Sequence, residues 1–458
     1  MTTAPQSMDG LSEEQTEAFR KAQETIHNGR SLTLLQAMAV KRALKQALPP
    51  ESAFRHYKQA FAPGPDVHLH RRAAVSQLTA AEAGALVMHV VHPGGETVEM
   101  HPSPAIGQPS EMQTIRGQTR RVFVACLPDA TAFARSSTVR LADGTFAFDI
   151  QPGELGKLPV DLSFDPVVFD HEGDKVTIID DQRETRQLHL PEALSLLGMD
   201  TVSFGHWMCE EFLKFLTARR YPEVARLPIL IDANMPRQHR ESLVAFTGEA
   251  HPIIAVPRFM RVKVDRLWIV SNWFYSPKIL TTDRGVDANA LATPMVPVAE
   301  IYREAWEMLD ATLPSRPSAG NFFIARDPNR HRSITNLDEV ENILRHHGFE
   351  TVRPETMSFV EQFHLYNGAT HLVVQTGSAE TGCIMCKPGT RTCLLSHPAM
   401  PFRAIWSQAL RDLGIEATAL VGSFDRINNV YADKSDYRVD PDLLDSFLTE
   451  MLRNGRQA

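Results

Sequence analysis

The stretch VVQTGSAETGCIMCKPGT, residues Val373–Thr390, carries an apolar β-branched pair through two glycines into a run of small residues with helical character. A glycine-rich turn of this kind connects strand to helix in an ordinary parallel sheet. It is also a place where the N–H groups of a helix N-terminus receive an anion. The stretch alone does not separate these two roles, so its neighbours must supply the context.

The last third of the chain, which surrounds this turn, alternates between strand and helix patterns. Two predicted helices begin with Asn336 and Ser358, each followed three residues later by a glutamate, and Gly348 ends the first of them. The predicted strands are NFFIA, FETV, HLVV and RTCLLS. Successive strand–helix units predict a parallel sheet, with the quoted turn at the carboxyl end of a strand, the edge where such sheets bind ligands.

The preceding part of the chain predicts a second α/β unit. Residues 119–200 contain short apolar runs separated by turn residues, including a hairpin signal at Asp143-Gly144. A helix over 204–219 then leads into further alternating strands and helices. Near the N-terminus, residues 11–48 predict two helices that end at Pro49-Pro50 and dock on the rest of the protein or on a partner.

Length and composition restrict the classes of function. A chain of 458 residues predicts two or three domains, and its net charge of −8 disfavours nucleic acid as a partner. No apolar run approaches the ~18–20 residues of a membrane span, and the N-terminus lacks the apolar core of a signal peptide, so we expect a soluble, cytoplasmic protein. The five cysteines are expected to be reduced thiols, with Cys383 and Cys386 packed in the core.

The first candidate site is the pair His206 and Glu210 in SFGHWMCEEFLKFL. Apolar residues of this segment form one helical stripe that should face the core, and the pair lies four residues apart on the opposite side. Near a helix start, such a pair can face a cleft, where the carboxylate acts as a base or orients the imidazole and raises its pKa. The alternative is a solvated pair that adds roughly 0.2–0.5 kcal/mol to helix stability.

The second candidate site is IARDPNRHRSITN, which places Arg326, Arg330 and Arg332 directly after a strand. Arginine forks match phosphate oxygens, and the helix that starts at Asn336 adds the positive potential of its N-terminus. The alternative is an ordinary surface loop that carries three arginines.

The third candidate site is the quoted turn. Gly377 lets the backbone approach a diphosphate, and the N–H groups from Ser378 to Thr381 point toward it. Glu380 would repel phosphate and suits sugar or ribose hydroxyls better. The turn lacks the Lys-Ser/Thr of a P-loop and the G-x-G-x-x-G of a dinucleotide fold. The chain also lacks the serine-hydrolase and zinc-protease motifs, and no metal site is expected.

These three sites, in this order, resemble glycosyltransferase family 61, whose bacterial members work on surface polysaccharides and whose eukaryotic members transfer sugars to proteins or to xylan. The resemblance covers roughly Val122–His397. Its most specific parts are Phe204-Gly205-His206-Trp207 with Glu210, then FFIARDPNRHRSITN, then the segment from HHGFETV to QTGSAETG with KPGT after it. In the middle block, the arginine at the strand end, the second arginine and the asparagine of the family fall on Arg326, Arg332 and Asn336.

The chain departs from the family in the turn. The family often has His-Gly-Ala there and an Asn a few residues on, whereas this chain has Thr376-Gly377-Ser378 and Gly382. The glycine is kept and two polar contacts differ. This departure leaves the donor open and motivates the alternative of a protein that binds a nucleotide without transferring sugar.

The resemblance implies a GT-B arrangement, an α/β fold in which two Rossmann-like domains face a cleft. The implied division is a helical and mixed N-terminal extension over 1–118, an acceptor-side domain over 119–300 and a nucleotide-sugar domain over 301–458. His206 and Glu210 would stand on the acceptor wall. The donor wall would hold Arg326, Arg332, Asn336, Thr376, Gly377, Ser378, Glu380 and Thr381.

We therefore expect a hexosyl- or pentosyltransferase that moves a sugar from a nucleotide-sugar donor to a glycan or lipid-linked glycan acceptor in surface polysaccharide biosynthesis. The transfer is expected to invert the anomeric centre and to need neither metal nor cofactor, with His206 or Glu210 as the base. The alternative is a non-catalytic nucleotide-binding or scaffolding protein of a polysaccharide assembly. Residues 11–48 would then join it to a partner or to a second copy. A nicotinamide-dependent enzyme ranks last because its fingerprint is missing.

Overall fold

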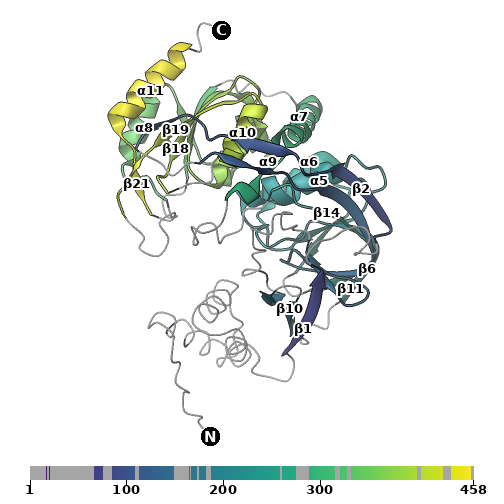
Figure 1. The fold of residues 1–458 in the computed structure, drawn as a ribbon. Helices are drawn as coiled ribbons and strands as arrows, with labels where there is room; N and C mark the ends of the chain where they lie inside the picture. The colour runs from purple at the N-terminus through teal and green to yellow at the C-terminus, as the bar shows by residue number, and fades with distance from the viewer. Residues whose placement is uncertain are drawn as a thin grey trace.

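The computed structural model has a mixed α/β fold with two large sheets (Figure 1). It describes residues 17, 20, 67–75, 85–108, 113–148, 165, 167–172, 175–181, 187–257, 260–274, 288–314, 320–326, 332–399, 404–426 and 435–454. The two helices expected over 11–48 therefore lie outside the described residues, apart from Glu17 and Arg20, which are helical. The domain boundaries expected at 118 and 300 stay predictions.

The first large sheet combines a parallel and an antiparallel part. Four strands form the parallel part, in the order β13 (Ile253–Val256), β12 (Ile229–Asp232), β11 (Gln187–Ser195) and β14 (Arg261–Val270). β14 also pairs antiparallel with β6 (Val122–Phe133). From β6 the sheet continues through β7 (Thr138–Arg140), β8 (Phe146–Phe148), β1 (Val67–Val75), β10 (Lys175–Asp181) and β9 (Val168–Glu172), with β2 (Val87–His92) paired to β6 as well. The hairpin expected at Asp143-Gly144 joins β7 to β8, with Gly144 at φ 87°.

The second large sheet is parallel throughout, as the strand–helix alternation predicted. Its order is β16 (Glu350–Val352), β15 (Gly320–Ile324), β17 (Ala369–Gln375), β18 (Arg391–Ser396), β19 (Glu416–Val421) and β4 (Ala105–Gly107). β4 comes from the early part of the chain and adds to the edge of a sheet made from the last third. Two short sheets accompany the large ones, β3 (Thr97–Met100) with β5 (Ile115–Gln118) and β20 (Ser423–Phe424) with β21 (Tyr437–Arg438).

Helices cover both faces of the second sheet. Along β15, the side chain of Phe323 packs in the cluster that contains α8 and α11, whereas Phe322 and Ile324 pack in the cluster that contains α9 and α10. This alternation is expected for a strand buried on both faces. The helices are α8 (Leu337–His346), α9 (Phe359–Gly368), α10 (Ala404–Asp412) and α11 (Pro441–Asn454).

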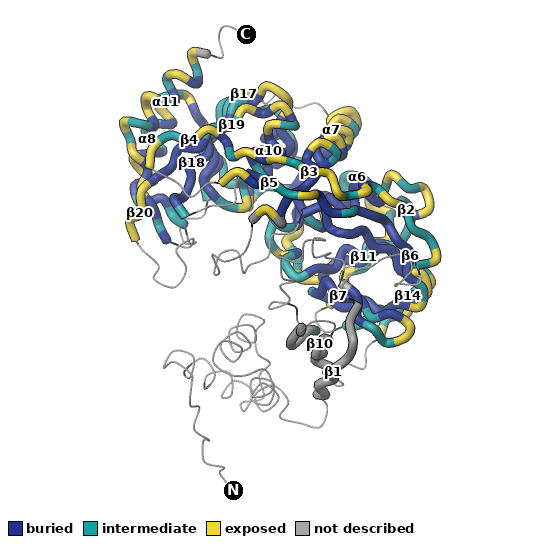
Figure 2. Tube along the Cα trace, viewed as in Figure 1, coloured by how far each residue is buried: buried dark blue, intermediate teal, exposed yellow. Residues whose placement is uncertain are grey.

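Three more helices connect the two sheets through one apolar core. They are α5 (Phe212–Ala218), α6 (Arg237–Thr247) and α7 (Met295–Thr312). On α7, Trp306 stacks on Phe212 of α5 at 6.0 Å between ring centroids and contacts Phe363 of α9 at 5.9 Å. Figure 2 shows the buried residues running through both sheets and the helices between them. The two sheets are therefore packed together rather than joined by a linker alone.

Hydrogen bonds across the two halves strengthen this junction. The backbone N–H of Phe359, at the start of α9, donates to Glu241 of α6 at 2.8 Å. The Gln238 amide, also on α6, donates to the carbonyls of Glu355 and Met357 at 3.0 and 3.1 Å. Glu355 lies in the 3-10 turn η4 (Pro354–Thr356). The start of α9 is thus held by α6, the helix that connects β12 and β13 of the first sheet.

Two local expectations had different outcomes. Ser358 forms the expected capping box, because its hydroxyl accepts from the Glu361 N–H and the Glu361 carboxylate accepts from the Ser358 N–H. Asn336 stands at the expected N-cap of α8, but its side chain makes no capping hydrogen bond. Its amide oxygen accepts from the Val439 N–H at 3.1 Å, and its Nδ2 donates to the Val439 carbonyl at 2.9 Å and to Glu339 at 3.0 Å. A distant segment has taken the side chain that would otherwise cap the helix.

Candidate functional site

His206 and Glu210 lie at the start of the helix expected over 204–219. The helix begins as α4 (Phe204–His206), continues as a π-helical turn η1 (Trp207–Glu211), and then runs into α5. His206 Nδ1 is 2.8 Å from Glu210 Oε1, and the two side chains are 27% and 18% exposed. π-helical turns occur frequently at functional sites. The structure therefore pairs the two residues and leaves both accessible to solvent.

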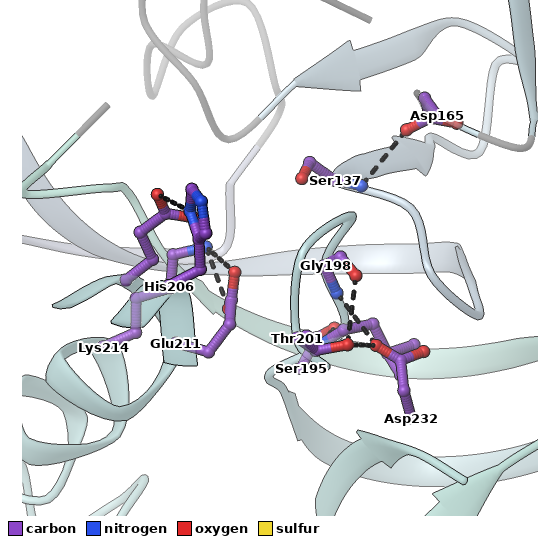
Figure 3. Close-up of polar contacts among 11 residues, drawn as sticks. Ser137, Asp165, Ser195, Gly198, Thr201, His206, Glu211, Lys214 and Asp232 are labelled. Atoms are coloured by element: carbon purple, nitrogen blue, oxygen red, sulfur yellow. Dashed lines mark hydrogen bonds and ion pairs between the residues drawn. The ribbon is translucent and has the colours of Figure 1, made fainter. Parts of the chain in front are cut away.

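Glu211 and Lys214, further along the same helical segment, form an ion pair inside the protein. Lys214 Nζ lies 3.2 and 3.1 Å from the two oxygens of Glu211, and the side chains are 2% and 5% exposed. Figure 3 shows this ion pair on the same helical segment as His206. The carboxylate packs so closely on Gly198 that a Cβ there would come within 2.5 Å of Glu211 Oε1. The buried face of the helix is thereby fixed to the loop that precedes it.

That loop, between β11 and α4, is held in turn by Asp232 at the end of β12 (Figure 3). The Asp232 carboxylate accepts from the N–H groups of Arg135 and Gly198 at 2.6 and 3.3 Å and from the Thr201 hydroxyl at 2.7 Å. Burial raises the pKa of Asp232 to about 6. His239 Nδ1 lies 2.8 Å from the Thr201 carbonyl oxygen, and burial lowers the pKa of His239 to about 4. These contacts give the helix of His206 a rigid support.

The turn at Gly377 is built around the Arg326 side chain. Gly377 has φ 145° and ψ −162°, and a Cβ there would lie 2.6 Å from Arg326 Nη1. The same Nη1 donates to the Thr376 carbonyl at 2.7 Å. Only a glycine allows the guanidinium to lie directly on the turn, because the backbone conformation and the space both exclude a side chain. The residues after the turn, Ser378–Met385, form a 3-10 helix, η5, instead of an α-helix.

The remaining predicted donor-wall residues differ in what their side chains do. Thr376 is buried, and its hydroxyl donates to the Leu395 carbonyl at 2.6 Å and accepts from the His397 N–H at 3.1 Å. Asn336 is likewise buried in the contacts with Val439 described above. Both side chains are therefore engaged in hydrogen bonds to backbone groups of the protein. Ser378 is exposed, Arg332 and Glu380 are half-buried, and Thr381 is buried, whereas Arg330 lies outside the described residues.

The structure brings the first and third candidate sites into contact. A Cβ on Gly205, next to His206, would lie 3.3 Å from Thr381 Oγ1 and 3.7 Å from Ser378 Oγ. The Cys209 thiol, one turn further on, donates to the Gly205 carbonyl at 2.7 Å and is buried. The helix that carries His206 and Glu210 thus packs directly on η5, the segment that follows the turn on which Arg326 lies.

Comparison with known families identifies this constellation. Residues 204–393 match the profile described as Glycosyltransferase 61. Over this range, the chain is similar to glycosyltransferase family 61. The matched range begins at the helix of His206 and ends in β18, so it includes all three candidate sites. It supports a glycosyltransferase activity. A comparison with curated proteins found no match.

Within the matched range, the structure explains the glycine at position 382, where the resemblance led us to expect an Asn. Gly382 lies in η5 under Tyr366 of α9, where a Cβ would overlap the aromatic ring. The Tyr366 hydroxyl donates to the Ala379 carbonyl at 2.9 Å. The position is filled by a ring from a neighbouring helix, so no side chain can reach a ligand from there.

Sequence reasoning missed one residue of the candidate site, Gln375. Its Oε1 accepts from the Arg326 N–H at 3.1 Å, and its Nε2 donates to the Arg332 carbonyl at 3.2 Å. One amide therefore holds both ends of the arginine loop at the end of β17. Arg332 adopts φ 65°, a left-handed conformation that is uncommon for a residue other than glycine. A polar residue that ends the apolar strand HLVVQ could have indicated this role.

In the ranges that the structure describes, no three or more His, Cys, Asp or Glu side chains gather as a metal site would require. Among the helices of those same ranges, none combines the length and the apolar character needed to cross a bilayer. The five cysteines are free thiols and all are buried.

Proposed function

We propose that this protein transfers a sugar from a nucleotide-sugar to a hydroxyl of a glycan or lipid-linked glycan, in surface polysaccharide synthesis in the cytoplasm. The observation that carries the proposal is the contact of Gly205 with Ser378 and Thr381, which puts a His–carboxylate pair beside an arginine-lined turn. Transfer from a diphosphate donor needs a base next to an anion-binding element. The two packed sheets support a GT-B arrangement, with the acceptor on the side of residues 119–300.

On the donor side, Arg326 and Arg332 would neutralise the diphosphate, assisted by the N–H groups at the start of η5. These groups supply positive potential without a metal ion or a cofactor. Glu380 repels phosphate, so we assign it to hydroxyls of the donor sugar. Thr376 and Asn336 are assigned positioning roles, because their side chains are buried in hydrogen bonds to backbone groups of the same sheet edge.

In the proposed step, the acceptor oxygen attacks the anomeric carbon on the face opposite to the diphosphate. The new C–O bond forms as the bond from that carbon to the diphosphate oxygen breaks, and the electron pair of the broken bond leaves with the diphosphate. The acceptor proton moves to Nε2 of His206. The Glu210 carboxylate accepts from Nδ1–H, which selects the tautomer with a basic Nε2. A single displacement inverts the anomeric centre.

Donor binding is tested by the thermal shift that UDP, GDP, CMP, TDP or NAD produces, because a ligand that binds only the folded state raises the melting temperature. We expect one nucleotide to stabilise the wild type and to lose this effect in Arg326→Ala. Arg303→Ala is a matched control, since Arg303 also donates to a backbone carbonyl, that of Asp412 at 2.9 Å, on the exposed surface of α7. Absence of any shift in the wild type would refute the proposal.

The base is tested by release of the nucleoside diphosphate from the matching nucleotide-sugar. We expect His206→Ala to lower the rate ~10²–10⁴-fold. Glu210→Gln, which keeps an oxygen that can accept from Nδ1–H, should lose less, and the reverse order would assign the base to Glu210. His189→Ala is the control, because His189 forms an exposed pair with Asp265 at 2.6 Å. Full activity in both site variants would refute the assignment. Nucleotide binding by a wild type that transfers no sugar would favour the scaffolding alternative.

A further inference from the structure

Phe424 is an exposed aromatic residue at the carboxyl edge of the second sheet. It ends the short strand β20, which follows β19, and its relative exposure is 45%. The other large apolar residues exposed in the described ranges are aliphatic: Leu86, Val90, Val202 and Val296. A single exposed apolar residue is ordinary. Phe424 is distinguished by its position at the edge where parallel sheets bind ligands.

The support behind Phe424 is rigid. Its ring stands nearly perpendicular to that of His397, at 5.4 Å between centroids, and His397 is buried and packs on Tyr437 at 5.3 Å. The Tyr437 hydroxyl donates to the Leu395 carbonyl at 2.8 Å. Through pairing with Tyr437, the backbone of Phe424 is also fixed. An exposed ring on a fixed support loses little conformational freedom when a flat ligand covers it.

The same contacts connect Phe424 to the proposed diphosphate site. The His397 N–H donates to Thr376 Oγ1 at 3.1 Å, and the Thr376 carbonyl accepts from Arg326 Nη1 at 2.7 Å. In the sheet, β17 and β19 are separated only by β18. Because neighbouring strands are roughly 4.8 Å apart, the two strand ends lie about 10 Å from each other. A ribose with its base can extend over such a separation from a diphosphate held at Gly377.

Phe424 also lies on the side of the site away from the proposed base. The helix of His206 packs on η5, directly after the Gly377 turn, whereas β20 follows a strand two places along the sheet. In Figure 1, β21, the partner of β20, stands well apart from α5. The donor sugar must lie near His206 for transfer. The part of the donor that points toward Phe424 is therefore the nucleoside.

We infer that Phe424 provides the surface on which the nucleobase of the donor stacks, so the ligand extends from η5 to β20 across the sheet edge. This inference rests on the proposed function. Stacking suits this position because every base has a flat π-face, and an exposed ring offers contact without selecting a base by hydrogen bonds.

The test compares a nucleoside diphosphate with inorganic pyrophosphate, a probe that has the same diphosphate and no base. With the nucleotide that stabilises the wild type, Phe424→Ala should raise Kd roughly 5- to 150-fold, which corresponds to the loss of about 1–3 kcal/mol of stacking on one aromatic ring. Binding of pyrophosphate should not change. Phe424→Tyr, which keeps the ring, should restore nucleotide binding. Val296→Ala is the control, since Val296 is exposed at 60% in α7.

Each outcome separates the two ideas. Unchanged nucleotide binding in Phe424→Ala would overturn the inference and leave the proposed function in place. An equal loss of pyrophosphate and nucleotide binding would also overturn it, because the substitution would then act on the diphosphate site. If the wild type binds none of the nucleotides, the proposed function fails first. Arg326→Ala, which should weaken both probes, identifies the diphosphate site independently.

Discussion

Replacing Gly377 with alanine is expected to destabilise the protein more than an ordinary glycine substitution does. Gly377 has φ 145° and ψ −162°, a backbone conformation that is nearly restricted to glycine. A Cβ would lie 2.6 Å from Arg326 Nη1 and 2.7 Å from Cζ. The guanidinium would therefore have to leave the turn, and the hydrogen bond from Nη1 to the Thr376 carbonyl would break.

The magnitude follows from these two contributions. The strained backbone costs about 1–3 kcal/mol, and loss of a hydrogen bond from a charged donor costs about 1.5–3 kcal/mol. The free energy of unfolding should thus fall by roughly 2.5–6 kcal/mol. Gly248 separates the contributions, because it has φ 81° and ψ 161° with no heavy atom within 4 Å of an added Cβ. Gly248→Ala should show the backbone cost alone, about 1–3 kcal/mol.

The test is completed by urea unfolding of four variants: Gly377→Ala, Gly248→Ala, Arg326→Ala and the double variant Gly377→Ala/Arg326→Ala. Arg326→Ala removes the group that clashes, so the second substitution then adds only the backbone cost. The two substitutions should therefore fail to add by about 1.5–3 kcal/mol. Additive effects, or a Gly377→Ala variant no less stable than Gly248→Ala, would show that the guanidinium does not lie on the turn as described.

Two further substitutions test the support under the helix of His206. Lys214→Met leaves the Glu211 carboxylate buried without its ammonium partner and should lower the free energy of unfolding by about 3–5 kcal/mol. The double variant Lys214→Met/Glu211→Leu should lower it by less. If the double variant unfolded at a lower urea concentration than the single variant, this prediction would be contradicted. Burial lowers the pKa of His239 from 6.5 to about 4. Between these pH values the folded state therefore binds fewer protons than the unfolded state, and the free energy of unfolding falls by about 3 kcal/mol as the pH falls through them. The free energy of unfolding of the wild type should therefore exceed that of His239→Asn most near pH 7, and this difference should be about 3 kcal/mol smaller at pH 4. A difference that stays constant across this pH range would refute the assignment.

The fold of the last third could be predicted because its elements are specified locally. Ser358 and Glu361 cap each other within one turn, and Gly348 ends α8 at φ 77°. In contrast, no pattern in Gln187–Ser195 predicts β11, and its Pro191 is disfavoured in a central strand. Pro191 lies in the part of β11 that pairs with β14 alone, because β12 pairs with β11 only at Leu194 and Ser195. The pairing of β4 with β19 joins distant segments, and no local pattern in β4 indicates it.

The candidate site shows the same limit for side chains. The sequence indicated which residues stand at helix starts and strand ends, but not which of them meet. Gly205, Gly377 and Gly382 look alike in sequence, yet each is approached by a different neighbour: Thr381, the Arg326 guanidinium and the Tyr366 ring. At these three positions the glycine lets a neighbour approach closely, and only the folded chain identifies that neighbour.

Gln375 connects the folded structure to ligand binding at the proposed donor site. Its single amide holds the backbone at both Arg326 and Arg332, so folding itself orders the two ends of the arginine loop. Backbone that is fixed before the ligand arrives loses less conformational entropy on binding, and fixed charges stabilise a leaving diphosphate without reorganising. The residue that the sequence patterns did not single out is therefore the one that connects the stability of the sheet edge to the affinity of the proposed donor site.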